Sequence, residues 1–151
     1  MKKLIIVALF TGLFAASHAT DESSSESKPS RIIFLIGDGM GLSAVSTTVY
    51  FGDQISAFDR FQEIGLVNTS SATHKVTDSA ASGTAMSTGT KTYNGAIGVD
   101  TEQNVLKNIT EILSDQGWST GVVSTSSVTH ATPATFYAHV RNRSMQEVIA
   151  S

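Results

Sequence analysis

Residues 77–85 read Thr-Asp-Ser-Ala-Ala-Ser-Gly-Thr-Ala, and this stretch is the most informative part of the chain. An acid, Asp78, and a hydroxyl, Ser79, come immediately before small residues that predict a helix over residues 79–88. The first N–H groups of a helix are unpaired and lie at the positive end of its dipole, so they attract anions. The stretch therefore predicts a phosphate-binding helix start. Taken alone, Asp78 is equally well a simple helix cap, and Ser79 a residue that helps the helix begin.

A second carboxylate follows a predicted buried strand. Residues 31–36 are mainly apolar and lead into Gly-Asp-Gly-Met-Gly at residues 37–41, which places Asp38 at the carboxyl end of the strand. The glycines let a bulky ionic centre come close, and a carboxylate can bridge two cations. A dinucleotide loop is excluded because Leu42 occupies the place of the third glycine. A turn aspartate without metal remains an alternative; with residues 77–85, the pattern favours metal-assisted chemistry on a phosphate ester.

The rest of the chain alternates between the two kinds of regular structure. We predict a helix over residues 42–50, a short strand over 64–69, a helix over 104–115 and a strand over 118–124. This order, with reactive residues just after strand ends, indicates an α/β fold with a mainly parallel central sheet flanked by helices. Residues 144–151 look like a helix that is just starting. We therefore expect the chain to be a truncated part of a larger domain, with an incomplete sheet.

The first 19 residues have the features of a secretory signal peptide. Two lysines precede an apolar run that is too short to span a bilayer, and Ser-His-Ala follows it. We expect cleavage after Ala19 and a periplasmic or secreted protein with no membrane attachment afterwards. Residues 20–30 have no apolar side chain and predict a flexible polar linker. The folded domain is expected to span residues 31–151.

Composition limits the kind of chemistry. Loss of the leader removes two of the ten Lys and Arg residues and none of the 13 acids, so the net charge changes from −3 to −5. This balance argues against general nucleic-acid binding, and phosphate chemistry must depend on local cations. The chain has no cysteine, which leaves histidines and carboxylates as metal ligands. His74 and His139 lack metal-ligand spacing, so we interpret them as surface or hydrogen-bonded core histidines.

Two residues near the C-terminus could complete such a site. Thr132 offers a hydroxyl oxygen of the hard type that magnesium accepts, and Pro133 fits the first turn of a short helix predicted over residues 134–137. Arg143 can place two parallel N–H bonds on a phosphate. From position alone, Thr132 is an ordinary helix cap, while Arg143 and the neighbouring Arg141 are surface charges.

Several of these segments, in their order and spacing, resemble the alkaline phosphatases. They are residues 31–41, residues 77–85, Lys-Thr-Tyr-Asn-Gly at 91–95 and His-Ala-Thr-Pro at 130–133. The resemblance implies the alkaline-phosphatase-like α/β fold, with residues 31–151 as the N-terminal part of its catalytic domain. It also implies hydrolysis of small phosphate monoesters with two zinc ions and one magnesium ion, and a homodimer when the protein is full length.

The resemblance assigns roles to four of the residues quoted. Ser79 is implied to be the nucleophile, to ligate zinc and to form a phosphoserine intermediate. Asp78 is implied to position the phosphate-binding Arg143. Asp38 is implied to bridge one zinc and the magnesium.

Two further residues match the family's magnesium site. Thr132 is implied to be a magnesium ligand, and His130 falls where family members carry an aspartate or a histidine that shapes the magnesium shell. A histidine at this place puts the metal preference in question, because imidazole suits zinc or cobalt better than magnesium. The family's remaining ligands lie in its C-terminal half, and nothing after Arg143 provides them. We therefore expect little or no activity from this chain alone.

Other functions remain open at this stage. A secreted fragment that binds phosphate without turnover would use the same helix start and the same arginine. A sulfatase or phosphodiesterase relative shares the broad chemistry, although the motifs at residues 77–85 and 91–95 argue against it. A serine acyl hydrolase is disfavoured because the chain has no Gly-x-Ser-x-Gly elbow.

Overall fold

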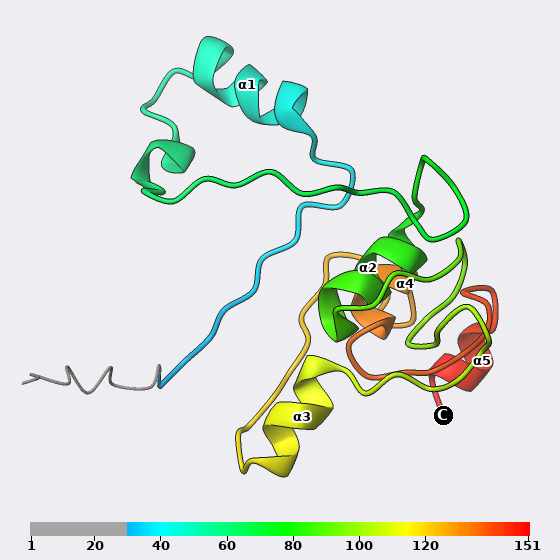
Figure 1. Cartoon of the computed structure of the whole chain (residues 1–151). Coiled ribbons are helices and arrows are strands. Elements are labelled where there is room, and N and C mark those ends of the chain that lie inside the picture. Colours follow the sequence, from blue (N-terminus) through cyan, green and yellow to red (C-terminus); the bar gives the residue numbers. More distant parts are fainter. Residues whose placement is uncertain (1–29) are drawn as a thin grey trace, which may run out of the picture. The chain divides into compact units, whose positions relative to one another are not determined.

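The computed structural model describes residues 30–151. The chain divides into two units, Met1–Leu35 and Ile36–Ser151, and the helices described belong to the second. They are α1 (Leu42–Phe51), the 3₁₀ helix η1 (Ala57–Arg60), α2 (Ser79–Thr88), α3 (Ile109–Asp115), α4 (Ala131–Ala134) and α5 (Gln146–Ile149) (Figure 1). The predicted signal peptide, and the predicted linker up to residue 29, lie outside the described residues. No helix among residues 30–151 is long and apolar enough to cross a membrane.

Helix α2 begins and ends where the sequence predicts. Asp78 caps its start, because the Asp78 Oδ1 atom accepts a hydrogen bond from the backbone N–H of Ala81 at 2.9 Å. At the other end Gly89 has a φ of +75°, the left-handed conformation that glycine favours and that ends many helices. Local sequence thus fixes Ser79 as the first residue of this helix.

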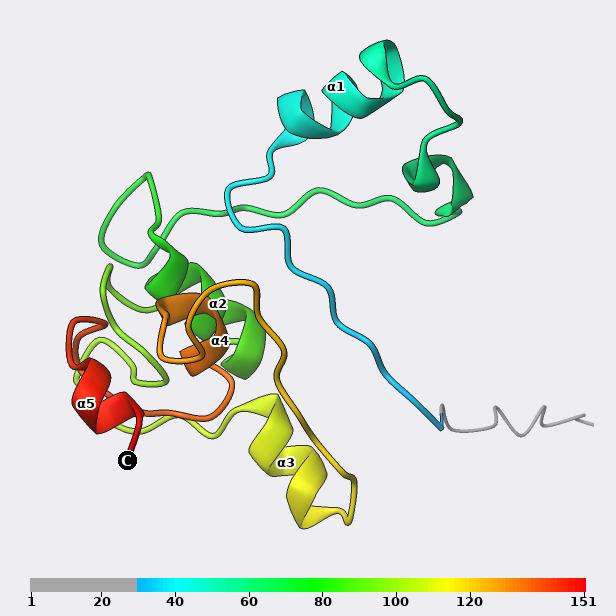
Figure 2. The ribbon, with the colours of Figure 1, turned by 180° about the vertical axis from the view of Figure 1, so that it is seen from behind.

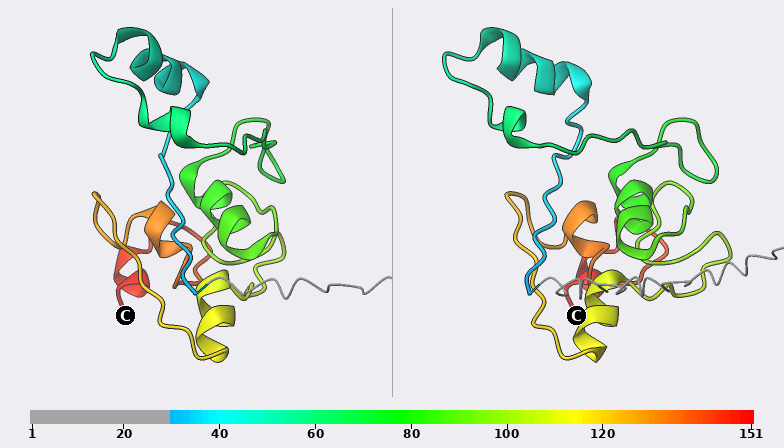
Figure 3. Two further views of the ribbon diagram at one scale, coloured as in Figure 1. Left: turned by 90° about the vertical axis from the view of Figure 1, so that its left-hand side faces the viewer. Right: turned by 60° about the vertical axis from the view of Figure 1, so that its left-hand side comes forward.

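Small residues let neighbouring segments approach α2 closely. Helices α2 and α4 pack against each other, as views from several sides show (Figures 2 and 3). A Cβ atom at Gly83 would lie 2.7 Å from the Oγ1 atom of Thr135, so a larger residue there would push the segment after α4 away. The buried Thr84 donates its hydroxyl to the carbonyl of Ala96 at 3.1 Å and accepts from the N–H of Gly98 at 3.0 Å.

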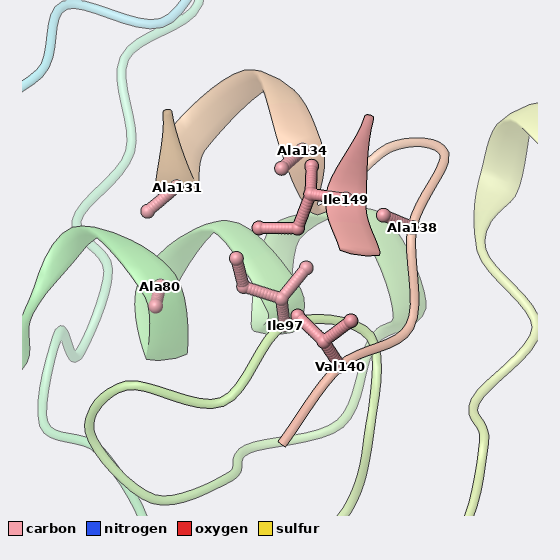
Figure 4. Packing of buried hydrophobic residues seen from close by; sticks show 7 residues of the cluster. All are labelled: Ala80, Ile97, Ala131, Ala134, Ala138, Val140 and Ile149. Carbon is pink, nitrogen blue, oxygen red and sulfur yellow. The ribbon is translucent and has the colours of Figure 1, made fainter. Parts of the chain in front are cut away.

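The apolar core of the second unit is small and lies beside α2. Its buried members are Ala80, Ile97, Ala131, Ala134, Ala138, Val140 and Ile149 (Figure 4). The backbones of Ile97 and Val140 form an antiparallel bridge with N–H···O distances of 3.0 and 2.8 Å. The core therefore joins α2, α4 and α5 to the segment that leads into Arg143.

Helix α1 confirms the prediction over residues 42–50, whereas α3 begins five residues later than predicted. The physical reason is a capping box. Asn108 accepts from the N–H of Glu111 at 3.0 Å, and the Glu111 side chain accepts from the N–H of Asn108 at 2.8 Å. These reciprocal bonds start the helix at Ile109, so residues 104–108 stay outside it.

Helix α4 lies three residues earlier than the predicted helix over 134–137. His130 precedes its first residue, and Pro133 lies within the first turn, where its missing N–H costs nothing. Thr132 is therefore inside the helix and does not cap it. Near the C-terminus, α5 falls within the helix start predicted over residues 144–151 and confirms it.

The predicted parallel sheet is not seen among residues 30–151. The bridges given for these residues are two isolated antiparallel ones, Ile97 with Val140 and Val99 with Val105. The described residues form no strand over 31–36, 64–69 or 118–124, where strands are predicted. Most of their apolar side chains are exposed, as the exposed fractions of Ile33 (83%), Leu66 (102%) and Val123 (99%) show, whereas Ile36, Trp118 and Val122 are half-buried. The prediction that residues 31–36 are buried is thus wrong for this chain, because a strand needs paired neighbours and a covered face to be buried.

Candidate functional site

Asp38 lies at the centre of the candidate site. The Ser79 hydroxyl donates to its Oδ1 atom at 3.2 Å, and the Thr132 hydroxyl donates to its Oδ2 atom at 2.9 Å. A tight turn carries the carboxylate, since the N–H of Met40 donates to the carbonyl of Gly37 at 3.1 Å and Gly39 has a φ of +70°. Two hydroxyls that are far apart in the sequence thus meet one exposed carboxylate, each at a separate oxygen.

Ser79 occupies the first position of α2. The backbone N–H groups of this first turn have no hydrogen-bond acceptor within the helix. The Asp78 cap uses the N–H of Ala81, and the remaining free donors lie at the positive end of the helix dipole. Ten residues of helix stand behind this end. The Ser79 hydroxyl therefore lies where an attached or approaching anion is stabilised.

Arg143 reaches the same helix start from near the C-terminus. Its Nη1 atom lies 3.2 Å from the Oδ2 atom of Asp78, and both side chains are partly buried. The carboxylate of Asp78 thus serves two purposes, because Oδ1 caps α2 while Oδ2 holds the guanidinium. One residue before Ser79, this ion pair places a fixed positive charge near the hydroxyl.

The pKa of the Asp78 carboxyl lies below its ordinary value of 3.8. Burial acts to raise this pKa, but hydrogen bonds from the N–H groups of Ala81 and Gly95 lower it. The hydrogen bond and positive charge of Arg143 lower it further. Asp78 is therefore ionised at neutral pH and retains its hold on the guanidinium.

His130 contacts the arginine and not the Asp38 carboxylate. Its Nε2 atom lies 3.4 Å from the Nη2 atom of Arg143. Because a guanidinium only donates, the imidazole Nε2 must accept in this contact. The structure thus places the six residues selected from the sequence in two linked groups, one around Asp38 and one around Arg143, which the adjacent residues Asp78 and Ser79 connect.

The donor atoms around Asp38 suit part of a metal site. Carboxylate and hydroxyl oxygens are the ligands that Mg²⁺ prefers, and Asp38, Ser79 and Thr132 bring such oxygens together. Among residues 30–151, however, no group of three or more His, Cys, Asp or Glu side chains could hold a metal ion. Asp38, Ser79 and Thr132 therefore fit part of the ligand set of a metal centre, whose other ligands are not found among residues 30–151.

The other two described histidines, His74 and His139, have contacts outside this site. His74 is exposed and contacts the neighbouring Thr73 hydroxyl. His139 is partly buried, with Nδ1 2.9 Å from the carbonyl of Gly98 and Nε2 2.9 Å from the Glu111 carboxylate. His74 is thus a surface histidine, and His139 is a half-buried one with a partner at each ring nitrogen.

Sequence reasoning gave no role to the turn at residues 93–96, which contacts both sides of the Asp78–Arg143 pair. Tyr93 donates its hydroxyl to the carbonyl of Arg141 at 2.9 Å, and Asn94 donates its side-chain amide to the carbonyl of Val76 at 3.1 Å. The only signal for these contacts in the sequence is the motif Lys-Thr-Tyr-Asn-Gly at residues 91–95.

A helix start beside an arginine, with a carboxylate that accepts from two hydroxyls, defines a class of site, and comparison with known proteins identifies the family. The alkaline phosphatase family model matches residues 30–151. Alkaline phosphatase 3 of Bacillus subtilis is 38% identical over an alignment of 168 residues, gaps included. The alignment covers 99% of this chain and 36% of that protein. The alkaline phosphatase of Escherichia coli is 38% identical over 135 residues, covering 83% of this chain and 29% of that protein. The chain belongs to the alkaline phosphatase family.

Solved structures agree with this assignment. The alkaline phosphatase of the Antarctic bacterium TAB5 matches with a TM-score of 0.73 and 52% identity, over 75% of this chain and 33% of that one. A histidine-to-aspartate variant of the same enzyme, described with Mg bound in its M3 site, gives a TM-score of 0.73 at 51% identity, again over 75% and 33% of the two chains. The present chain spans about a third of the length of these relatives.

Proposed function

We propose that this chain supplies the nucleophile and the phosphate-binding arginine of a metal-dependent phosphomonoesterase. The observation that carries the proposal is the convergence at the start of α2. Ser79 donates to Asp38, Thr132 donates to the same carboxylate, and Arg143 pairs with Asp78 one residue before Ser79. Small phosphate monoesters are the substrates that this arrangement and the family suggest.

In the proposed reaction the Ser79 Oγ atom attacks phosphorus in line. The Oγ–P bond forms as the bond to the leaving oxygen breaks, which gives a phosphoserine, and water then releases inorganic phosphate. Arg143 binds phosphate oxygens through parallel N–H bonds, and Asp78 orients its guanidinium. The free N–H groups of α2 add positive potential at the same place.

Zinc and magnesium, when bound, supply the concentrated positive charge that phosphoryl transfer needs. We propose that Asp38, Ser79 and Thr132 contribute oxygen ligands, with His130 in the surroundings of the magnesium. The Mg described for the TAB5 variant supports a metal in this part of the family. The set of two zinc ions and one magnesium rests on the family resemblance.

The same proposal accounts for the exposed apolar segments. Residues 31–36, 64–69 and 118–124 would be strands of a mainly parallel sheet whose other strands, and remaining metal ligands, belong to the two thirds of the relatives that this chain does not match. We therefore propose little or no turnover by the 151-residue chain alone, with activity and homodimer formation in a full-length form. Export to the periplasm or beyond is proposed from the leader.

A fusion protein tests this function. The chain is joined to the C-terminal two thirds of the TAB5 enzyme, in place of the part of that enzyme that matches this chain. Over the matched part the two proteins are 52% identical. With zinc and magnesium present, the fusion is expected to hydrolyse p-nitrophenyl phosphate, and Ser79→Ala is expected to lower kcat by more than about a thousandfold. Phosphoserine at Ser79 should be detectable by mass spectrometry. Turnover that survives Ser79→Ala would overturn the role of Ser79 as nucleophile. Robust turnover by the unfused chain would overturn the proposal that the 151-residue chain is inactive alone.

A second function is favoured by the incomplete ligand set among residues 30–151: phosphate binding without turnover. It would use Arg143 and the start of α2 alone. Binding of inorganic phosphate that persists in Ser79→Ala, with no phosphoserine in the fusion, would support this second function.

A further inference from the structure

The turn at residues 93–96 lies between two segments that must be held together for the site to exist. Asp78 and Arg143 are 65 residues apart in the sequence, yet their side chains meet at 3.2 Å. The turn itself is closed by a hydrogen bond from the N–H of Ala96 to the carbonyl of Tyr93 at 3.2 Å. Gly95 has a φ of +94°, which glycine adopts easily and other residues rarely adopt.

The turn binds the Arg143 side of the pair through two carbonyl groups. The backbone N–H of Arg143 donates to the carbonyl of Gly95 at 2.8 Å, and the Tyr93 hydroxyl donates to the carbonyl of Arg141 at 2.9 Å. Next to it, the bridge between Ile97 and Val140 continues the contact with two backbone hydrogen bonds. The backbone that carries the guanidinium is thus attached to the turn at successive points.

The turn binds the Asp78 side through its other polar groups. The side-chain amide of Asn94 donates to the carbonyl of Val76, two residues before Asp78, at 3.1 Å. The backbone N–H of Gly95 is among the groups that lower the pKa of the Asp78 carboxyl. Neighbouring residues of the turn therefore contact both sides of the pair: the Asn94 side chain contacts the segment before Asp78, and the carbonyl of Gly95 accepts from the N–H of Arg143.

We propose that residues 93–96 act as a bracket that sets the position of the Arg143 guanidinium for phosphate. Tyr93 and Asn94 are positioning residues in this proposal: Tyr93 fixes the Arg143 side of the pair and Asn94 the Asp78 side, each through a backbone carbonyl. The role in phosphate binding rests on the proposed function, whereas the holding of Arg143 against Asp78 by the bracket can be measured without it.

The test uses the chain as given, with Tyr93→Phe and Asn94→Ala as separate variants. Tyr93→Phe keeps the ring and removes only the bond to Arg141. The matched control is Tyr137→Phe, which removes the same kind of bond, from a tyrosine hydroxyl to the carbonyl of Val128 at 2.7 Å, without contact to either partner. The first readout is the side-chain ¹⁵N NMR signals of Arg143, whose Nη rotation is expected to be slow while Asp78 holds the guanidinium.

Both bracket variants are expected to speed up this rotation and to weaken inorganic phosphate binding roughly two- to tenfold by calorimetry, the effect of losing one hydrogen bond. Tyr137→Phe should leave both unchanged. Arg143 signals and phosphate affinity in both variants that match those of Tyr137→Phe would overturn the bracket. If the unchanged chain binds no phosphate, the NMR signals alone decide whether the bracket holds Arg143, and the fusion protein decides the proposed function.

Discussion

At the level of single residues, the site depends on the geometry of one guanidinium. Arg143 donates from Nη1 to the Asp78 carboxylate, and its Nη2 atom lies 3.4 Å from Nε2 of His130. These two contacts fix the orientation of the planar guanidinium. A lysine has the same charge but no fork, and cannot keep one donor on Asp78 while presenting parallel donors to phosphate.

Arg143→Lys is therefore expected to weaken inorganic phosphate binding roughly ten- to hundredfold, the cost of a lost charge-assisted contact. Isothermal titration calorimetry measures it. Arg141→Lys is the matched control, because Arg141 is an exposed arginine two residues away. Equal affinities for the two variants would show that Arg143 contributes only its charge.

The candidate site residues could be selected from the sequence, by their chemistry and by the resemblance to a family. The positioning role of residues 93–96 could not be predicted in this way. Asp38, Ser79 and Arg143 carry groups whose chemistry suggests phosphate and metal. Tyr93 and Asn94 act on backbone carbonyls, and a carbonyl acceptor leaves no mark on the sequence. Only the folded chain brings the carbonyl of Arg141 within 2.9 Å of a tyrosine hydroxyl.

At the level of secondary-structure elements, helix ends were predictable where one residue determines them. Asp78, which the sequence already offers as a cap, sets the start of α2, and Gly89 sets its end. The start of α3 was missed because the pairing of Asn108 with Glu111 three residues later was not recognised. The predicted strands failed for another reason: a strand is defined by partners that may lie anywhere in the chain, and periodicity does not identify them.

The attachment of α3 is expected to depend on pH. Burial acts to raise the pKa of the Glu111 carboxyl, but the N–H of Asn108 and then His139 outweigh it, so the pKa lies below its ordinary value of 4.5. A lowered folded-state pKa means that ionised Glu111 stabilises the fold above pH 4.5, and that this contribution is lost as the pH falls through the folded value.

The midpoint of urea unfolding, measured between pH 7 and pH 3, tests this expectation. It should fall less steeply with decreasing pH in Glu111→Gln than in the unchanged chain, while Glu102→Gln, in the exposed loop before α3, should behave like the unchanged chain. Parallel pH curves for the unchanged chain and Glu111→Gln would contradict it.

At the level of the whole molecule, the chain combines a well-packed region around α2 with long apolar segments that face solvent. Exposed apolar surface of this extent is unusual in a protein that works alone. It agrees with the finding that the chain spans about a third of its relatives.

The unfused chain is accordingly expected to bind the dye ANS strongly and to lose most of this fluorescence when joined to the C-terminal part of the TAB5 enzyme. Dye binding occurs at solvent-exposed apolar groups such as Leu66 and Val123, and sheet formation would cover them. Fluorescence titration at equal protein concentration measures the difference. Equal dye binding by both forms would show that these segments stay uncovered in the fusion.

The complete burial of Asn108 has a practical consequence for production of the protein. Asn108, Ile109 and Thr110 form the triplet that eukaryotic secretion pathways glycosylate. The Asn108 side chain has an exposed fraction of 0%, so the folded chain has no room for a sugar there. In a yeast or mammalian host, a glycan attached before folding would compete with formation of α3, whereas Asn108→Asp would keep a capping oxygen and remove the acceptor.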